Sequence, residues 1–289
     1  MSDYGSPFSA TLKSRRWAGP LIHLLLAAAA LAFVFPMLWM LSTSLKSMDA
    51  VMAVPPRWIP SHPKWGNYAE ALRTIPFVRY FFNTVLVSVL GAVGMTASSA
   101  IVAYSFARLR WAGRDLLFAI FLGTMMIPFP VVMVPLYSVF RAFGWIGTLK
   151  PLWVPAFFGH AFNIFLLRQF FLRVPKSLGE AMSLEGASEW TIFTRIYLPL
   201  ARPALAVVAL FHITACWNDF LGPLLYLTDK DSFTLSLGLQ QFQSQNGGTF
   251  WQLMMAAAVL TVTPMVLLFI VAQKTFLRGM TYMKNVDLQ

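Results

Sequence analysis

Long apolar stretches alternate with shorter polar segments along most of this chain. A helix needs about 20 apolar residues to cross a hydrocarbon core of about 30 Å. It also satisfies every backbone polar group internally, so each such stretch is interpreted as a membrane-spanning helix. The predicted spans are residues 18–45, 81–107, 116–140, 152–172, 203–228 and 251–273. The pattern predicts an all-α, polytopic membrane protein with six transmembrane helices.

The composition supports a membrane protein, because hydrophobic residues make up 58% of the 289 residues and charged residues only 11%. Soluble domains are about a quarter charged. These values exclude a water-soluble enzyme and argue against nucleic acid as a partner, even though the net charge is +11. Of the 22 Lys and Arg residues, 14 lie in segments 1–19, 108–115, 168–202 and 274–289. The positive-inside rule therefore predicts that these segments, including both termini, are cytoplasmic.

This topology divides the chain into three parts. We expect a cytoplasmic segment at 1–17, a transmembrane permease domain at 18–275 and a cytoplasmic tail at 276–289. Several predicted spans contain interior prolines, among them Pro128, Pro135 and Pro264. An interior proline bends a helix, and lipid tolerates the break where neighbouring helices or a cavity satisfy the backbone. Together the prolines favour broken helices around an internal path, although ordinary packing explains any one of them.

Asp219 is the only acidic residue well inside a predicted span. A charge at that depth is costly, and it is usually functional or paired. His160 lies at a similar distance from the outer end of its own span, so the two side chains could pair. One hypothesis places Asp219 on the solute path. The alternative is a structural hydrogen bond that fixes a bend at Gly222–Pro223.

The segment 173–202 is the longest predicted cytoplasmic loop. Ser177 and Glu180 have the spacing of a capping box, which predicts a short helix that Gly186 ends in a left-handed conformation. Ser188 is expected to cap a second helix, 189–198, which Pro199 ends.

The first helix places Leu178, Ala181 and Met182 on one apolar face. A capped amphipathic helix on this loop predicts docking to a cytoplasmic protein. The alternative is a helix that lies on the membrane surface.

The order Glu180-Ala181-Met182, Gly186 and Ile196-Tyr197-Leu198-Pro199 resembles the EAA loop of bacterial ABC importer permeases. The resemblance implies that the loop is a coupling helix, which seats on an ATPase subunit. The implied coupling residues are Glu180, Ala181, Met182, Gly186, Ile196, Leu198 and Pro199. One departure is Met182, where the family usually has alanine.

Further stretches are similar to the carbohydrate-uptake branch of these permeases, and specifically to its maltose-permease-like second subunit. They are residues 124–128, 134–137, 166–170, 217–220 and 276–281. The candidate solute path comprises Trp217, Asn218, Asp219, His160 and Asn163. The resemblance also implies that the outer loop contacts a solute-binding protein, through Gln243, Ser244, Gln245, Asn246, Gly247 and Gly248. A plain connector is the alternative for that loop.

The resemblance implies import of a sugar or oligosaccharide across the cytoplasmic membrane by alternating access. The implied partners are a second permease, two ABC ATPase subunits and an extracytoplasmic solute-binding protein. A non-sugar solute such as glycerol phosphate is an alternative. A proton-coupled secondary transporter that uses Asp219 with His160 or His212 is another alternative. That hypothesis does not explain the 173–202 loop.

Sequence motifs of nucleotide binding and catalysis are absent, including GxxxxGK[ST], HExxH and GxSxG. The single cysteine, Cys216, excludes an intramolecular disulfide and a metal site built from several cysteines. We therefore expect no catalytic residues, no metal and no cofactor in this chain. ATP hydrolysis is expected to belong to separate subunits.

Overall fold

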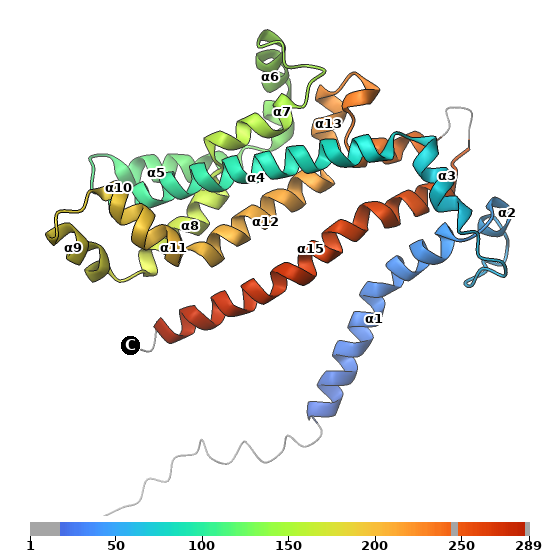
Figure 1. Ribbon diagram of the computed structural model, residues 1–289, viewed down its shortest axis with the longest axis horizontal. Coiled ribbons are helices and arrows are strands. Elements are labelled where there is room, and N and C mark those ends of the chain that lie inside the picture. The colour runs from blue at the N-terminus through green and yellow to red at the C-terminus, as the bar shows by residue number, and fades with distance from the viewer. Residues whose placement is uncertain (1–17, 244–247, 287–289) are drawn as a thin grey trace, which may run out of the picture.

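The computed structural model describes residues 18–243 and 248–286, and every named element in this part of the chain is helical. The central element is α4 (Phe77–Arg108), against which α8 (Ala161–Arg173) and α12 (Arg202–Asn218) pack along their lengths. A second pair is formed by α1 (Ala18–Ser44) and α15 (Trp251–Val286), with α15 also contacting α12 (Figure 1). The predicted all-α class is confirmed.

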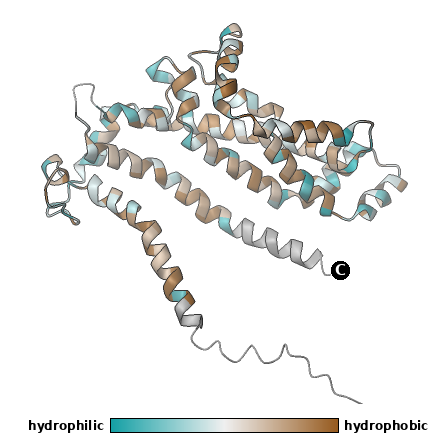
Figure 2. Ribbon diagram, turned by 180° about the vertical axis from the view of Figure 1, so that it is seen from behind, coloured by the Kyte–Doolittle hydropathy of each residue, from teal (hydrophilic) through white to brown (hydrophobic). Residues whose placement is uncertain are grey.

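Three helical stretches are each long and apolar enough to cross a membrane: Ile22–Ser44, Phe77–Arg108 and Trp251–Gln273. They coincide with the first, second and sixth predicted spans. The described residues contain up to five spans if each of two bent helix pairs counts as one. Figure 2 shows hydrophobic residues predominating along the long helices, with hydrophilic residues at the ends of the bundle. Beyond its span, α15 continues as one helix to Val286, through most of the predicted tail.

The third and fourth predicted spans are broken, as their prolines suggest. In the third, α5 (Arg114–Gly123) and the 3₁₀ turn Thr124–Met126 meet α6 (Phe129–Ala142) at an angle of 99°. In the fourth, α7 (Lys150–Trp153) and the 3₁₀ turn Val154–Phe158 precede α8. The break before α8 falls at Gly159, whose φ of +78° is a conformation that favours glycine. The 13-residue α8 is therefore the only long element of this span.

The fifth predicted span has its breaks at different positions from those expected. The chain bends by 75° just before α12, and α12 ends at Asn218. A short helix, α13 (Leu221–Tyr226), follows. The predicted bend at Gly222–Pro223 is wrong, because both residues lie in the first turn of α13. A proline is tolerated there, since the first turn leaves its backbone N–H groups without helical acceptors.

Small residues on α4 allow its neighbours to approach closely. A Cβ atom on Gly91 would lie 2.4 Å from Nε2 of His212 on α12, and one on Gly94 would lie 2.2 Å from the Phe157 ring. The Ser98 hydroxyl donates to the backbone oxygen of Gly94 at 2.8 Å, so this polar group is satisfied within the helix. α4 therefore packs closely through its small residues, as membrane helices commonly do.

Two buried clusters lie at opposite ends of α4. One contains Tyr104, Leu167, Phe171, Phe193 and Tyr197, and the other contains Tyr80, Trp217, Leu235, Phe242 and Leu253. The first cluster adjoins α9 (Lys176–Leu184), α10 (Glu189–Ile192) and α11 (Leu198–Leu200), and the second adjoins α3 (Gly66–Thr74) (Figure 1). The bundle therefore has a separate core at each of its two ends.

The segment between the first two spans is folded rather than a plain loop. It contains α2 (Met48–Val51) and α3 (Gly66–Thr74). The Asn67 side chain donates to the backbone oxygens of Ser44 and Lys46, both at 2.8 Å. Lys46 is only 2% exposed, with its Nζ 4.3 Å from the centre of the Trp39 ring, and burial lowers its pKa. These contacts fix α3 against the end of α1.

Candidate functional site

The helix α9 (Lys176–Leu184) lies on the loop that follows α8, and it ends as predicted. Gly186 has a φ of +83°, its N–H bonds the Ser183 oxygen at 3.0 Å, and the N–H of Ala187 bonds the Met182 oxygen at 3.0 Å. This pair of bonds around a left-handed glycine is the Schellman motif, which satisfies carbonyls at a helix end. The predicted turn at Gly186 is confirmed.

The start of α9 differs from the prediction. The helix begins at Lys176, directly after Pro175, and no side chain caps it. Ser177 therefore lies inside the first turn rather than at the cap position, so the predicted capping box with Glu180 is wrong. Ser188 does cap the next helix, since its Oγ accepts the Thr191 N–H at 3.3 Å.

The second predicted helix is built from three segments. They are α10 (Glu189–Ile192), a π-helical turn Phe193–Tyr197 and α11 (Leu198–Leu200). Pro199 does not end the helix, because the chain continues to Leu200 and bends at Ala201. Proline lacks the N–H that would bond the Arg195 oxygen, and a wider π turn precedes it. Single π turns are frequent at functional sites.

The predicted apolar face of α9 is split between two surfaces. Leu178 is 43% exposed and Leu184 is 91% exposed, with Ala181 exposed between them. Met182 instead packs against the buried cluster around Tyr104. The assignment of Met182 to the outward face is therefore wrong. We call Leu178, Ala181 and Leu184 the outward surface of α9.

The predicted coupling residues fall into two groups. Glu180, Ala181 and Gly186 are exposed. Ile196 and Leu198 are partly buried against the same cluster as Met182, and Pro199 is half-buried. The second group therefore holds the loop on the bundle, while the first is open to a partner.

Several polar contacts fix the loop to the ends of α4 and α8. The Tyr104 hydroxyl donates to Oε2 of Glu189 at 2.7 Å. Arg108, the last residue of α4, donates to the backbone oxygens of Phe171 and Val174. Its guanidinium also lies 4.7 Å from the centre of the Tyr197 ring. In the sequence, the one sign that Arg108 holds this loop to the bundle was its position at the end of an apolar span.

The candidate solute-path residues lie on α12, just after it, and at the start of α8. Trp217 is buried and donates to the Thr261 oxygen at 3.1 Å, while Asn218 is exposed. Asn163 is buried, and its Oδ1 has no hydrogen-bond partner. His160 accepts the N–H of Phe162 at 3.3 Å and so caps α8.

Asp219 uses its carboxylate to hold the start of α13. Its Oδ1 accepts the Gly222 N–H at 3.0 Å, and its backbone oxygen accepts the Ser236 hydroxyl. Within residues 18–243 and 248–286, no ion pair or hydrogen bond joins Asp219 to His160. The pairing that the sequence left open is not formed. This same described region holds no group of three or more His, Cys, Asp or Glu that could bind a metal ion.

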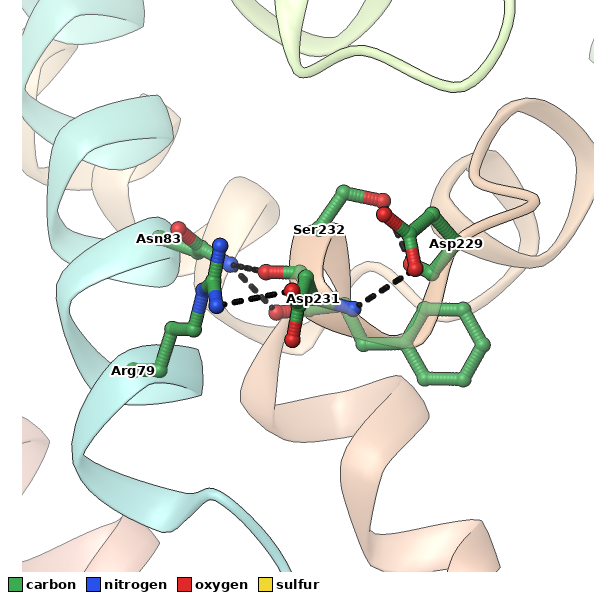
Figure 3. Close-up of polar contacts among 6 residues, drawn as sticks. Arg79, Asn83, Asp229, Asp231 and Ser232 are labelled. Atoms are coloured by element: carbon green, nitrogen blue, oxygen red, sulfur yellow. Dashed lines mark hydrogen bonds and ion pairs between the residues drawn. The ribbon is translucent and has the colours of Figure 1, made fainter.

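The segment after α13 is anchored to the first turns of α4 (Figure 3). Arg79 forms an ion pair with Asp231 at 2.9 Å, and the Asn83 amide donates to the backbone oxygens of Asp231 and Phe233 at 3.0 and 2.9 Å. The Thr84 hydroxyl accepts the Leu235 N–H at 2.9 Å. This segment is therefore fixed to α4, and the sequence pattern missed its contacts.

The same segment contains α14 (Leu235–Leu239) and leads into the predicted binding-protein loop. Gln243 forms an isolated antiparallel bridge with Thr249, which closes the base of the loop. Gly248 is exposed. Ser244, Gln245, Asn246 and Gly247 lie outside the described residues.

We expect Asn83→Leu to loosen residues 229–243 more than Arg79→Gln does. The leucine removes two hydrogen bonds, each contributing about 0.5–1.5 kcal/mol. The side chains of the Arg79–Asp231 pair are 56% and 55% exposed, and such pairs contribute about 0–1 kcal/mol. Amide hydrogen exchange of this segment measures the effect. Faster exchange in Arg79→Gln than in Asn83→Leu would contradict the ranking.

Broken membrane helices, together with a short helix held at one end of the bundle, fit a membrane permease. Residues 98–282 match the family described as binding-protein-dependent transport system inner membrane component, and the chain belongs to this family. It is therefore a membrane permease subunit rather than an enzyme. The prediction of an ABC importer permease is confirmed over the proton-coupled alternative.

Individual relatives cover most of the chain. It is 33% identical to the diacetylchitobiose uptake system permease protein NgcG of Streptomyces coelicolor, over 92% of this chain and 88% of that protein. It is 29% identical to the trehalose/maltose transport system permease protein MalG of Thermococcus litoralis, over 90% of this chain and 95% of that protein. A bacterial ABC transporter involved in the import of the acidic polysaccharide alginate shares the fold. The TM-score is 0.80 at 24% identity, covering 95% of this chain and 100% of that one.

Proposed function

We propose that this chain is one of two permease subunits of an ATP-driven importer and moves a sugar or oligosaccharide by alternating access. Relatives support this solute class: besides NgcG and MalG, a Bacillus subtilis relative at 30% identity is the galactooligosaccharides transport system permease protein GanQ. Uptake of labelled oligosaccharides by cells that express the complete system tests it. Accumulation of none of them would overturn the assignment.

A second solute class has support from one relative. The osmoprotective compounds uptake permease protein GgtD of Synechocystis is 29% identical over 92% of both chains. A small polyhydroxylated osmolyte would share with an oligosaccharide the hydroxyl groups that polar path residues recognise. Competition by such osmolytes for uptake separates the two classes.

The ATPase subunits are proposed to dock on the outward surface of α9. The observation that carries this proposal is the exposure of Leu178 and Leu184 on a helix whose other side is fixed to the bundle. Exposed leucines beside acidic residues suit a protein groove better than an anionic membrane surface. In this arrangement α9, both chain termini and the ATPases lie on the cytoplasmic side.

We expect Leu184→Glu to prevent stable association with the ATPase. The side chain is almost fully exposed in the chain itself, so the substitution leaves the fold intact and places a charge in the docking surface. Co-purification of the ATPase with the tagged permease measures the effect. Leu72→Glu is the matched control, because Leu72 is 40% exposed on α3 at the opposite end of the bundle. Equal recovery of the ATPase with both variants would contradict docking at α9.

The opposite end is proposed to receive the solute-binding protein, on the segment that Asn83 and Thr84 anchor. These contacts suit this role, because they hold the segment that leads into the predicted contact loop against α4. The second permease is proposed to cover exposed apolar helix surface. Phe82 and Leu86 are examples on α4, at 63% and 43% exposure.

A further inference from the structure

A polar cavity of about 300 Å³ lies between the end of α4, the segment that follows it and α9. Its charged lining residues are Arg108, Arg110, Arg114, Lys176, Glu180 and Glu189. Four basic side chains against two carboxylates give the cavity an excess of positive charge. Such a cavity favours an anion over the neutral solutes discussed above.

The positive charge is only partly neutralised inside the protein. Glu189 accepts the Tyr104 hydroxyl, and Arg114 pairs with Asp115 at 2.9 Å. Among the residues that the structure describes, neither the Arg110 nor the Lys176 side chain takes part in an ion pair or a hydrogen bond. They approach the cavity from two different places, the segment that follows α4 and the first turn of α9. An anion between them would hold α9 to the bundle.

The cavity lies where an apolar span ends. Arg108 is the last residue of the membrane-crossing stretch Phe77–Arg108, so the cavity is at the level of lipid head groups. Along the preceding turns of α4 runs an apolar groove of about 600 Å³, which Val93, Ala100 and Phe193 help to line. A polar cavity near an apolar groove fits an anionic head group with an acyl chain.

We propose that this cavity binds the phosphate of an acidic phospholipid, with Arg110 and Lys176 as its principal contacts and an acyl chain in the apolar groove along the preceding turns of α4. Basic pockets beside membrane helices bind anionic head groups. The bound lipid stabilises the position of α9. The site requires neither the solute nor the ATPase proposed above, so its test is independent of theirs.

The test uses the full chain in nanodiscs of phosphatidylcholine, titrated with phosphatidylglycerol, and counts bound lipid by native mass spectrometry. We expect Arg110→Gln combined with Lys176→Gln to weaken phosphatidylglycerol binding about tenfold. Arg195→Gln combined with Arg202→Gln is the matched control, since both side chains are exposed and neither lines the cavity. Equal binding by the two double variants would overturn the proposal.

Two further measurements identify the source of the phosphate and the role of the site. Glycerol 3-phosphate shares the head-group chemistry, and we expect it to bind far more weakly because it lacks the acyl chain. Binding as tight as that of phosphatidylglycerol would overturn the lipid as the source. Phosphatidylglycerol should slow amide exchange in α9 of the unsubstituted chain and of the control. An equal slowing in the Arg110/Lys176 double variant would also overturn the proposal.

Discussion

Replacement of Gly186 by valine is expected to abolish most ATP-dependent uptake. Gly186 has a φ of +83°, and a left-handed conformation costs an ordinary residue about 1–2 kcal/mol and a β-branched residue more. The valine favours a different chain direction after α9, which breaks the two hydrogen bonds of the turn and reorients the outward surface. Since about 1.4 kcal/mol is a factor of ten in population, we expect initial uptake rates to fall about tenfold.

Two control variants separate the turn from the added side chain. Gly186→Asn should retain most uptake, because asparagine tolerates the left-handed conformation. Gly66→Val should also retain it, since Gly66 does not adopt a positive φ and no atom lies within 4 Å of an added Cβ. Space is equally open around Gly186, so a clash does not explain a loss there. Normal uptake by Gly186→Val would contradict the role of the turn in coupling.

The long spans could be predicted because length and apolarity suffice for a membrane helix. The stretches Ile22–Ser44, Phe77–Arg108 and Trp251–Gln273 follow from this rule alone. The sequence also indicated that the third span is broken, since Pro128 and Pro135 interrupt it. It could not give the 99° angle, which depends on what the two halves pack against.

Local signals predicted the end of α9 better than its faces. A glycine after a short amphipathic helix has a specific backbone consequence, and Gly186 adopts it. Met182 follows Leu178 at the spacing expected of a residue on the same docking face. Its side chain instead packs against the buried cluster around Tyr104. That cluster is assembled from α4, α8 and the π turn, so no local pattern contains it.

The anchor between α4 and residues 229–233 was missed for a similar reason. Arg79 and Asp231 are 152 positions apart, and each is an ordinary charged residue at the end of a predicted span. Asn83 donates to backbone oxygens. Every residue has a backbone oxygen, so the pattern of side chains does not indicate which ones Asn83 bonds. Contacts of this kind need the three-dimensional arrangement of the bundle.

Asp219→Leu is expected to reduce transport strongly, whereas Asp219→Asn is expected to retain it. The Asp219 carboxylate accepts the N–H of Gly222, which is buried. Leucine offers no acceptor, and an unsatisfied buried donor costs about 1–3 kcal/mol. The asparagine Oδ1 can accept the same hydrogen bond. We therefore expect a loss of about tenfold or more for leucine and only a small change for asparagine, measured as initial uptake rates at equal amounts of assembled complex.

The comparison also decides between the two hypotheses for this residue. If Asp219 positions α13, only the hydrogen-bond acceptor matters and the charge does not. If its charge acts on the solute path, asparagine removes that charge as completely as leucine does, and both variants lose transport. Asp49→Asn is the matched control, because it removes the charge of an exposed carboxylate on α2 that is not a candidate path residue. Loss of uptake in Asp219→Asn, with normal assembly and a normal Asp49→Asn control, would replace the structural role with a direct role of the carboxylate charge.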